Sequence, residues 1–361
     1  MEEIDLCHQQ LTEIPKWVFD NPQVRVLNLS DNHLTSLPPE IGKLPRLTTL
    51  CLAGNHLITL PPEIGQLKQI ITLDLANNQL SHLPSEIGQL KRMIILDLTG
   101  NRLTSLPPEI GKLPRLEKLY LGGNQLTSLS TEVGQLKHLT TLNLEGNQLT
   151  SLPPELARLT TLTTLDLRFN LLTSLSPELG LLTQLTVLCL GGNQLTSLPP
   201  ELGLLTKLTR LSLGGNQLTF LPPELWQLIH LTTLSLGDNQ LTSLPPGIGK
   251  LTRLTTLSLA GNQLTFLPPE LGQLTHLIIL HLGNNQLTSL PVTLCNLRCA
   301  EIYFSGNPIT HLPSQFEGFR QQDQVGKKLY FDPQSVHNTK IKHSPHQSVK
   351  KKNIGIKSVL T

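Results

Sequence analysis

The stretch Leu142-Asn143-Leu144-Glu145-Gly146-Asn147-Gln148-Leu149 contains the pattern that decides the fold of this chain. Its frame of two leucines, an asparagine and a third leucine recurs along most of the 361 residues. The matching asparagines are Asn32, Asn55, Asn78, Asn101, Asn124, Asn147, Asn170, Asn193, Asn216, Asn239, Asn262, Asn285 and Asn307. They are 23 residues apart, except for a last step of 22. A fixed period of this length predicts one solenoid of stacked repeats instead of several globular domains.

Each unit follows the pattern Leu-x-x-Leu-x-Leu-x-x-Asn-x-Leu-x-x-Leu-Pro-x-x-Ile-x-x-Leu, as in residues 47–67. Leu50 and Leu52 alternate with polar or small residues, which predicts a short strand with one buried face. Stacked strands would then form a parallel sheet that lines a concave surface. The asparagine both donates and accepts hydrogen bonds, so we expect it to satisfy backbone groups of its turn and its neighbour.

The segment Pro38–Leu44 and its copies predict a single helical or 3₁₀ turn on the convex side. Proline fixes φ at the start of this segment, and we expect Gly42 to supply a left-handed residue at its end. A segment this short has no room for a full helix, so the array should curve gently.

The repeated motif resembles the leucine-rich repeat, specifically the 23-residue intracellular class of Ras-suppressor-like proteins, plant intracellular Ras-group proteins and Roco GTPases. The resemblance covers about residues 1–313. It implies an α/β solenoid, a horseshoe of about 14 repeats, that binds proteins and is not an enzyme. A protein ligand of unknown identity is the implied partner, and a small GTPase is one candidate by family resemblance.

The ends of the array should be atypical, because each would otherwise expose an apolar layer. In the first repeat we expect Glu2, Glu3, Trp17 and Phe19 to cover that layer. Residues 1–313 form the predicted repeat domain, and residues 314–331 contain aromatics that we expect to act as a C-terminal cap. Residues 332–361 are basic and polar, which is typical of disorder.

The cysteine and hydropathy patterns predict a cytoplasmic protein, whereas the charge pattern by itself indicates no particular partner. The net charge is +2, but residues 314–361 carry nine Lys/Arg against three Asp/Glu, and residues 1–313 carry 19 against 23. Cys51 and Cys189 lie six repeats apart, roughly 29 Å at about 4.8 Å per strand, so they cannot form a disulfide. The sequence after Met1 lacks a secretory h-region, and no apolar run reaches the roughly 18 residues of a membrane span.

The concave positions suggest one candidate protein-binding patch. Aligning the repeats places charged and aromatic residues of the N-terminal half on neighbouring strands, and such residues are the usual anchors of interfaces. The patch consists of Asp74, Asp97, Lys118, Tyr120, Asn143, Glu145, Asp166, Arg168 and Phe169. The alternative is a solvated strand face without a partner. Phe220, Phe266 and Trp226 are candidates for a second anchor of a protein ligand, but we expect these side chains to pack between repeats instead.

No catalytic or cofactor motif stands out. The phosphate-binding loop of Roco GTPases is absent, so we expect no enzyme activity and no cofactor. Cys295 and Cys299 lack a second half-site for zinc and are interpreted as small buried hydrophobes. His281 has no acid in its column to build a triad with Ser258. The lysines of the tail invite comparison with nucleic-acid or anionic membrane binding, but they lack interleaved aromatics, so nucleic-acid binding is not expected.

Three functional readings remain open on the sequence. The first is an intracellular scaffold that binds a protein ligand on its concave face. The second is a substrate-recognition component for a separate enzyme, either a Roco-type GTPase or a bacterial effector ligase. The third is a recently expanded array without a dedicated role, since units such as residues 195–200 and 241–246 are identical.

Overall fold

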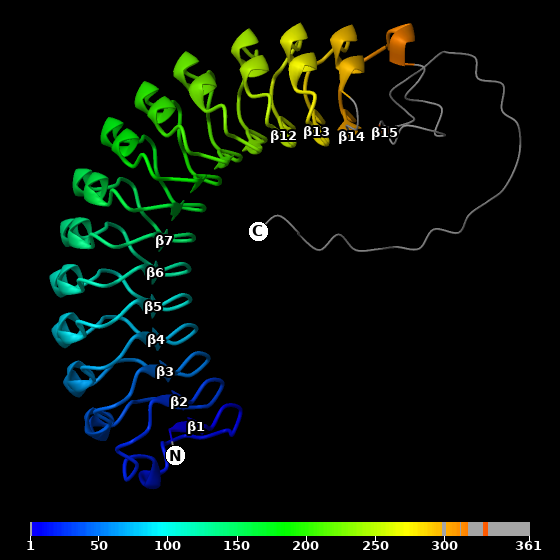
Figure 1. Ribbon diagram of the computed structural model, residues 1–361. Coiled ribbons are helices and arrows are strands. Elements are labelled where there is room, and N and C mark those ends of the chain that lie inside the picture. Colours follow the sequence, from blue (N-terminus) through cyan, green and yellow to red (C-terminus); the bar gives the residue numbers. More distant parts are fainter. Residues whose placement is uncertain (1, 298–300, 311, 317–327, 331–361) are drawn as a thin grey trace, which may run out of the picture.

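The computed structural model describes residues 2–297, 301–310, 312–316 and 328–330. The repeats stack into a horseshoe with β-strands on the inner, concave side and short 3₁₀ helices (η) on the outer, convex side (Figure 1). The strands are β1 (Glu3–Asp5), β2 (Val26–Asn28), β3 (Thr49–Cys51), β4 (Thr72–Asp74), β5 (Ile95–Asp97), β6 (Lys118–Tyr120), β7 (Thr141–Asn143), β8 (Thr164–Asp166), β9 (Val187–Cys189), β10 (Arg210–Ser212), β11 (Thr233–Ser235), β12 (Thr256–Ser258), β13 (Ile279–His281), β14 (Glu301–Tyr303) and β15 (Lys328–Tyr330). The helices are η1 (Lys16–Val18), η2 (Pro39–Lys43), η3 (Pro62–Gln66), η4 (Ser85–Gln89), η5 (Pro108–Lys112), η6 (Thr131–Gln135), η7 (Pro154–Arg158), η8 (Pro177–Leu181), η9 (Pro200–Leu204), η10 (Pro223–Gln227), η11 (Pro246–Lys250), η12 (Pro269–Gln273), η13 (Val292–Asn296) and η14 (Ser314–Phe316).

All strands in the described part of the chain belong to one parallel sheet, which has 15 strands there in chain order. Each strand residue pairs with the residue at the same position of the next repeat, as Leu142 pairs with Leu119 and Leu165. Side chains alternate along a strand, so the central residue points into the core and its two neighbours point to the concave face. The predicted solenoid, with a parallel concave sheet and short 3₁₀ turns on its convex side, is confirmed.

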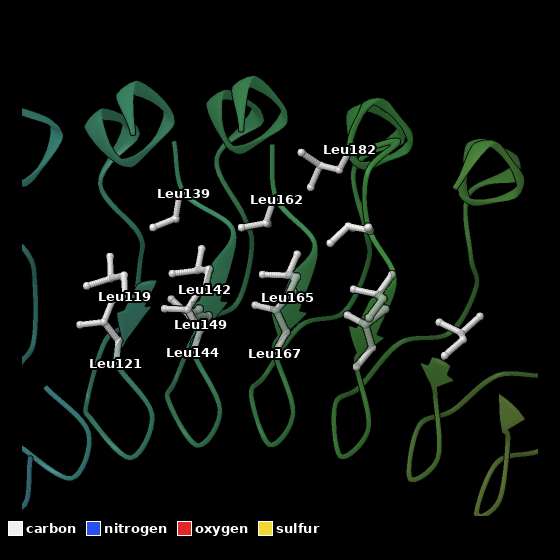
Figure 2. Packing of buried hydrophobic residues seen from close by; sticks show 14 of the residues in the cluster. Leu119, Leu121, Leu139, Leu142, Leu144, Leu149, Leu162, Leu165, Leu167 and Leu182 are labelled. Carbon is white, nitrogen blue, oxygen red and sulfur yellow. The ribbon is translucent and has the colours of Figure 1, made fainter. Parts of the chain in front are cut away.

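The core is a stack of leucine layers. Leu142, Leu144 and Leu149 of one repeat lie beside Leu165 and Leu167 of the next (Figure 2). All five are completely buried. Because each layer packs only on its two neighbours, the free energy of folding accumulates repeat by repeat along the chain.

The buried asparagines connect neighbouring repeats by hydrogen bonds. The amide of Asn147 donates to the carbonyls of Leu121 (3.0 Å) and Leu144 (3.0 Å), and its Oδ1 accepts from the N–H of Leu126 (3.0 Å). Leu121 and Leu126 belong to the preceding repeat. The predicted structural role of this position is therefore confirmed.

The glycine of each convex turn has a different role from the one predicted. Residues with positive φ lie in the turns after the strands, such as Gly54 at 67°, and Gly42 and Gly65 are not among them. A Cβ on Gly65 would lie 2.8 Å from the Cβ of Glu86 and 2.9 Å from its carbonyl oxygen. The prediction of a left-handed residue at Gly42 is wrong, and close contact between successive turns is the reason for glycine at this position.

The two ends differ in how the apolar layers are covered. In η1, Val18 is completely buried and Phe19 packs partly buried against the core, whereas Trp17 is 46% exposed. Trp17 therefore does not cover the first layer, contrary to our expectation. At the other end Phe316 is completely buried, and β15 pairs with β14. Most of the cap proposed for residues 314–331, and the whole tail proposed for 332–361, lie outside the described residues. In the described part of the chain, no helix is both long and apolar enough to cross a membrane.

Candidate protein-binding site

The candidate patch occupies the concave face between β4 and β8. Asp74, Asp97, Tyr120, Asn143 and Asp166 are the last residues of these five strands, and the strand register places them in one column. Lys118 begins β6. Glu145 and Arg168 follow the ends of β7 and β8 by two residues, and Phe169 lies in the turn after β8. The column that the sequence predicted therefore exists in space.

Arg168 joins the two nearest acids of the patch. Its Nη2 lies 2.9 Å from Oε2 of Glu145 and 2.7 Å from Oδ2 of Asp166, and its Nε donates to Oδ1 of Asp166 at 3.0 Å. Hydrogen bonding to Asp166 raises the pKa of Arg168 above its ordinary value, and the charges of Asp166 and Glu145 add to this effect. Asp166 is only 9% exposed, so the three side chains form a preorganised unit.

Several Asp and Asn side chains of the column also accept a backbone hydrogen bond in the turn that follows their own strand. Oδ1 of Asp74 accepts a hydrogen bond from the N–H of Ala76 (3.0 Å), and Oδ1 of Asn143 accepts one from Glu145 (2.9 Å). Asp97 makes the same bond with the N–H of Thr99 (2.9 Å). Local side-chain to backbone bonds are a common reason for Asp and Asn at strand ends. The sequence analysis missed this role. Its signal was that aspartate or asparagine recurs at the last strand position of several repeats.

Asp74 and Asp97 lie opposite each other on adjacent strands. Burial raises the pKa of Asp74, and the negative charge of Asp97 raises it further. Like charges at directly paired positions of a sheet destabilise the fold. In the part of the chain that the structure describes, neither carboxylate has a salt-bridge partner.

Phe169 is the residue of the patch whose backbone is strained. Its φ is 53°, in the left-handed region, and the other residues at this position of the repeat are Gly, Asp, Asn or, in the first repeat, His8. A bulky side chain is rare in this region and costs about 1–3 kcal/mol. The ring lies over Gly192, where a Cβ would be 2.9 Å from the Cε1 of Phe169. Nevertheless the side chain is 61% exposed.

A second aromatic group lies near the C-terminal end of the concave face. The rings of His281 and Tyr303 stack with centroids 4.6 Å apart, and the hydroxyl of Tyr303 donates to Oε2 of Glu301 (2.9 Å). Burial lowers the pKa of His281, while the charge of Glu301 raises it. Sequence reasoning missed Tyr303, because the last repeat is one residue shorter and its strand end falls out of the 23-residue frame.

The flank of the array also differs from the prediction. Trp226 is buried with 4% of its surface exposed, as expected for packing between repeats. Phe220 and Phe266 are each 58% exposed. Packing between repeats is therefore the wrong interpretation for these two phenylalanines, which stand where most repeats have serine.

Cysteines and metal-ligand side chains are dispersed among residues 2–297, 301–310 and 312–316. No group of three or more His, Cys, Asp or Glu side chains in that part could hold a metal ion. Cys7, Cys51 and Cys189 are free thiols, and Cys299 lies outside the described residues. Burial raises the pKa of Cys189 to about 11, so its reactive thiolate form is rare at neutral pH. The histidines and lysines of residues 332–361 also lie outside the described part of the chain.

Comparisons with known proteins identify the family. A search of curated proteins found no match. The family described as "Leucine rich repeat" matches residues 1–57, 45–103, 91–149, 137–195, 160–218 and 183–241, and a "Leucine-rich repeat region" matches residues 221–307.

Solved structures show the same fold. A leucine-rich repeat protein of Leptospira interrogans is 38% identical, with a TM-score of 0.76 over 92% of this chain and 95% of that chain. The plant peptide hormone receptor RGFR1, solved in complex with RGF2, is 28% identical, with a TM-score of 0.72 over 90% of this chain and 57% of that one. YopM, a leucine-rich effector protein of Yersinia pestis, is 26% identical, with a TM-score of 0.66 over 93% and 87% of the two chains. The chain described here belongs to the leucine-rich repeat family.

Proposed function

We propose that the chain is a non-enzymatic scaffold in the cytoplasm that holds a protein ligand against the patch from Asp74 to Phe169. The observation that carries this proposal is the exposed, strained Phe169. A solvated turn has no use for a bulky residue in left-handed backbone, and neighbouring repeats use glycine there at lower cost. Strain that persists beside a preorganised charged cluster is typical of a functional contact.

The anatomy of the patch fits a protein ligand. An exposed aromatic beside a fixed arginine and a tyrosine provides the residue types that dominate binding energy at interfaces. Arg168 is already held by Asp166 and Glu145, so binding would cost little additional side-chain ordering. RGFR1 was solved in complex with RGF2, which supports the use of such an array for binding.

The repeat motif also resembles that of the Ras-suppressor, plant Ras-group and Roco class. On that resemblance we propose a small GTPase as the first protein ligand to test. The similarity to the YopM effector favours one alternative, in which this chain selects substrates for a separate enzyme such as a Roco-type GTPase or an effector ligase.

The test compares the full chain with Phe169→Asn and Phe220→Ser as immobilised baits in lysate of the source organism. Asn77 and Asn284 occupy the position of Phe169 in other repeats, so the first variant preserves the turn. Phe220 is as exposed as Phe169 but lies on the flank, which makes it the matched control. We expect Phe169→Asn to reduce capture of a specific protein at least tenfold, and Phe220→Ser to leave it unchanged.

Equal capture by the unmodified chain and by Phe169→Asn would refute the patch as the binding site. Charge reversal of Asp166 is a poorer test, because it would leave the partly buried Arg168 without its main partner and disturb the fold.

A further inference from the structure

The strands of the concave sheet carry a net negative charge in the N-terminal half and no net charge from β9 to β14. The strands β1 to β8 contain five acids, namely Glu3, Asp5, Asp74, Asp97 and Asp166, and one base, Lys118. The strands β9 to β14 contain one acid, Glu301, and one base, Arg210. Arg168 already neutralises Asp166, so the remaining strand acids of this half are Glu3 and Asp5 of β1 and the directly paired Asp74 and Asp97.

The same chain carries a segment of complementary charge. Residues 332–361 contain the single acid Asp332 and the lysines Lys340, Lys342, Lys350, Lys351, Lys352 and Lys357. Three of these lysines are consecutive. A covalently attached segment is present at a high effective concentration near any surface that it can reach, so modest charge attraction suffices for contact.

The length of this segment allows the contact. Lys350 follows Tyr330, the last residue of β15, by 20 residues, which span up to about 70 Å when extended. β15 and β5 are ten strand steps apart in the sheet, or about 48 Å at 4.8 Å per step. The three consecutive lysines can therefore reach Asp97 and, one strand further, Asp74.

We propose that the lysine-rich segment 340–357 docks on the concave face of its own chain over Asp74 and Asp97, and so occludes the protein-binding patch. The occlusion rests on the proposed function, whereas the docking itself does not. Tyr120 and Lys118 lie on β6, directly beside Asp97, so a segment held at this pair would cover part of the patch. A cation between the two directly paired carboxylates would also relieve their mutual repulsion.

The structure supplies a charge change that preserves the fold. Asn28 and Asn143 occupy the position of Asp74 and Asp97 in other repeats and make the same turn bond through Oδ1. Asp74→Asn with Asp97→Asn therefore removes two charges from the face but keeps both turns. Glu86→Gln with Glu109→Gln removes two charges from η4 and η5, on the convex side of the same two repeats, and serves as the control.

The experiment titrates a fluorescent synthetic peptide of residues 332–361 into purified full-length chains and follows its anisotropy. In the variant Lys350→Glu, Lys351→Glu, Lys352→Glu, the concave acids should repel the tail, which leaves the concave face free to bind the peptide. We expect it to bind the peptide at least ten times as tightly as the unmodified chain, whose own tail competes. Adding Asp74→Asn and Asp97→Asn should weaken that binding at least tenfold, and adding Glu86→Gln and Glu109→Gln should not.

Equal peptide affinity of the unmodified and tail-reversed chains would overturn the proposal. The proposal would also fail if Glu86→Gln with Glu109→Gln weakened peptide binding as much as Asp74→Asn with Asp97→Asn does. A dimer of the unmodified chain in sedimentation velocity that the lysine changes abolish would show docking between two copies, which contradicts docking within one chain. No protein ligand enters this experiment, so its outcome is independent of the test with Phe169→Asn.

Discussion

The indole of Trp226 fills the space that a side chain at Gly247 would occupy in the next repeat. A Cβ on Gly247 would lie 2.6 Å from Cγ of Trp226. Other repeats have the opposite arrangement, in which a glycine such as Gly65 accommodates the Cβ of a glutamate, here Glu86. The large and small residues have thus exchanged places between η10 and η11. The exchange leaves Nε1 of Trp226 buried without a hydrogen-bond partner among the described residues.

This exchange predicts strong coupling between the two positions. Gly247→Glu alone should overpack the turn and lower the free energy of unfolding by about 1–3 kcal/mol. Trp226→Gly alone should leave a cavity and cost about 3–5 kcal/mol. The double variant restores the usual pair and should cost less than the sum by more than about 1 kcal/mol. Urea unfolding of all four proteins measures the cycle, and additive losses would contradict the coupling.

The asparagine ladder predicts a large effect at Asn147. Replacing it with leucine leaves buried backbone groups of two repeats unsatisfied, including the N–H of Leu126 and the carbonyl of Leu121. Each such group costs about 1–3 kcal/mol, so we expect a loss of about 2–5 kcal/mol in chemical denaturation. Gln148→Leu is the control, since it is exposed and Leu171 holds the same position in the next repeat. Similar losses in both variants would argue against the ladder as the cause.

Phe169 predicts opposite changes in stability and binding. Phe169→Asn replaces a strained residue by one that tolerates left-handed backbone, so we expect the free energy of unfolding to rise by about 1 kcal/mol. Thermal and urea denaturation measure this gain. A stability loss of that size would mean that contacts of the ring with Gly192 outweigh the strain.

The acid pair predicts a pH-dependent effect of Asp74→Asn. A carboxyl whose pKa is raised in the folded state binds more protons folded than unfolded, so folding stability falls as pH rises through the range just above 3.8. At pH 7 we expect Asp74→Asn to be more stable than the unmodified protein by about 0.2–1 kcal/mol. At pH 3 the difference should vanish. Urea unfolding at both values checks this, with Glu86→Gln as the control, and a difference that grows at low pH would refute it.

The repeat frame was enough to locate much of the candidate site, but it did not predict the contacts that stabilise the site. The frame placed Asp74, Asp97, Tyr120, Asn143 and Asp166 in one column, because strand register repeats with the sequence period. It did not show that the carboxylates accept hydrogen bonds from the turns after their strands, or that Arg168 forms ion pairs with both Asp166 and Glu145. Those contacts depend on side-chain directions. Tyr303 was missed for a related reason, since a repeat one residue short breaks the frame.

The sequence by itself determined the solenoid, the inward leucines and the asparagine ladder. A period of 23 residues makes each unit a neighbour of the next, and stacking the units buries the leucines of the repeat frame while it satisfies the asparagines of the ladder. Tertiary structure alone decided which glycines are left-handed, that Phe169 is strained, that Phe220 and Phe266 are exposed, and that Trp226 is matched by Gly247. Those features arise from the distance between adjacent turns, which a one-dimensional pattern does not contain.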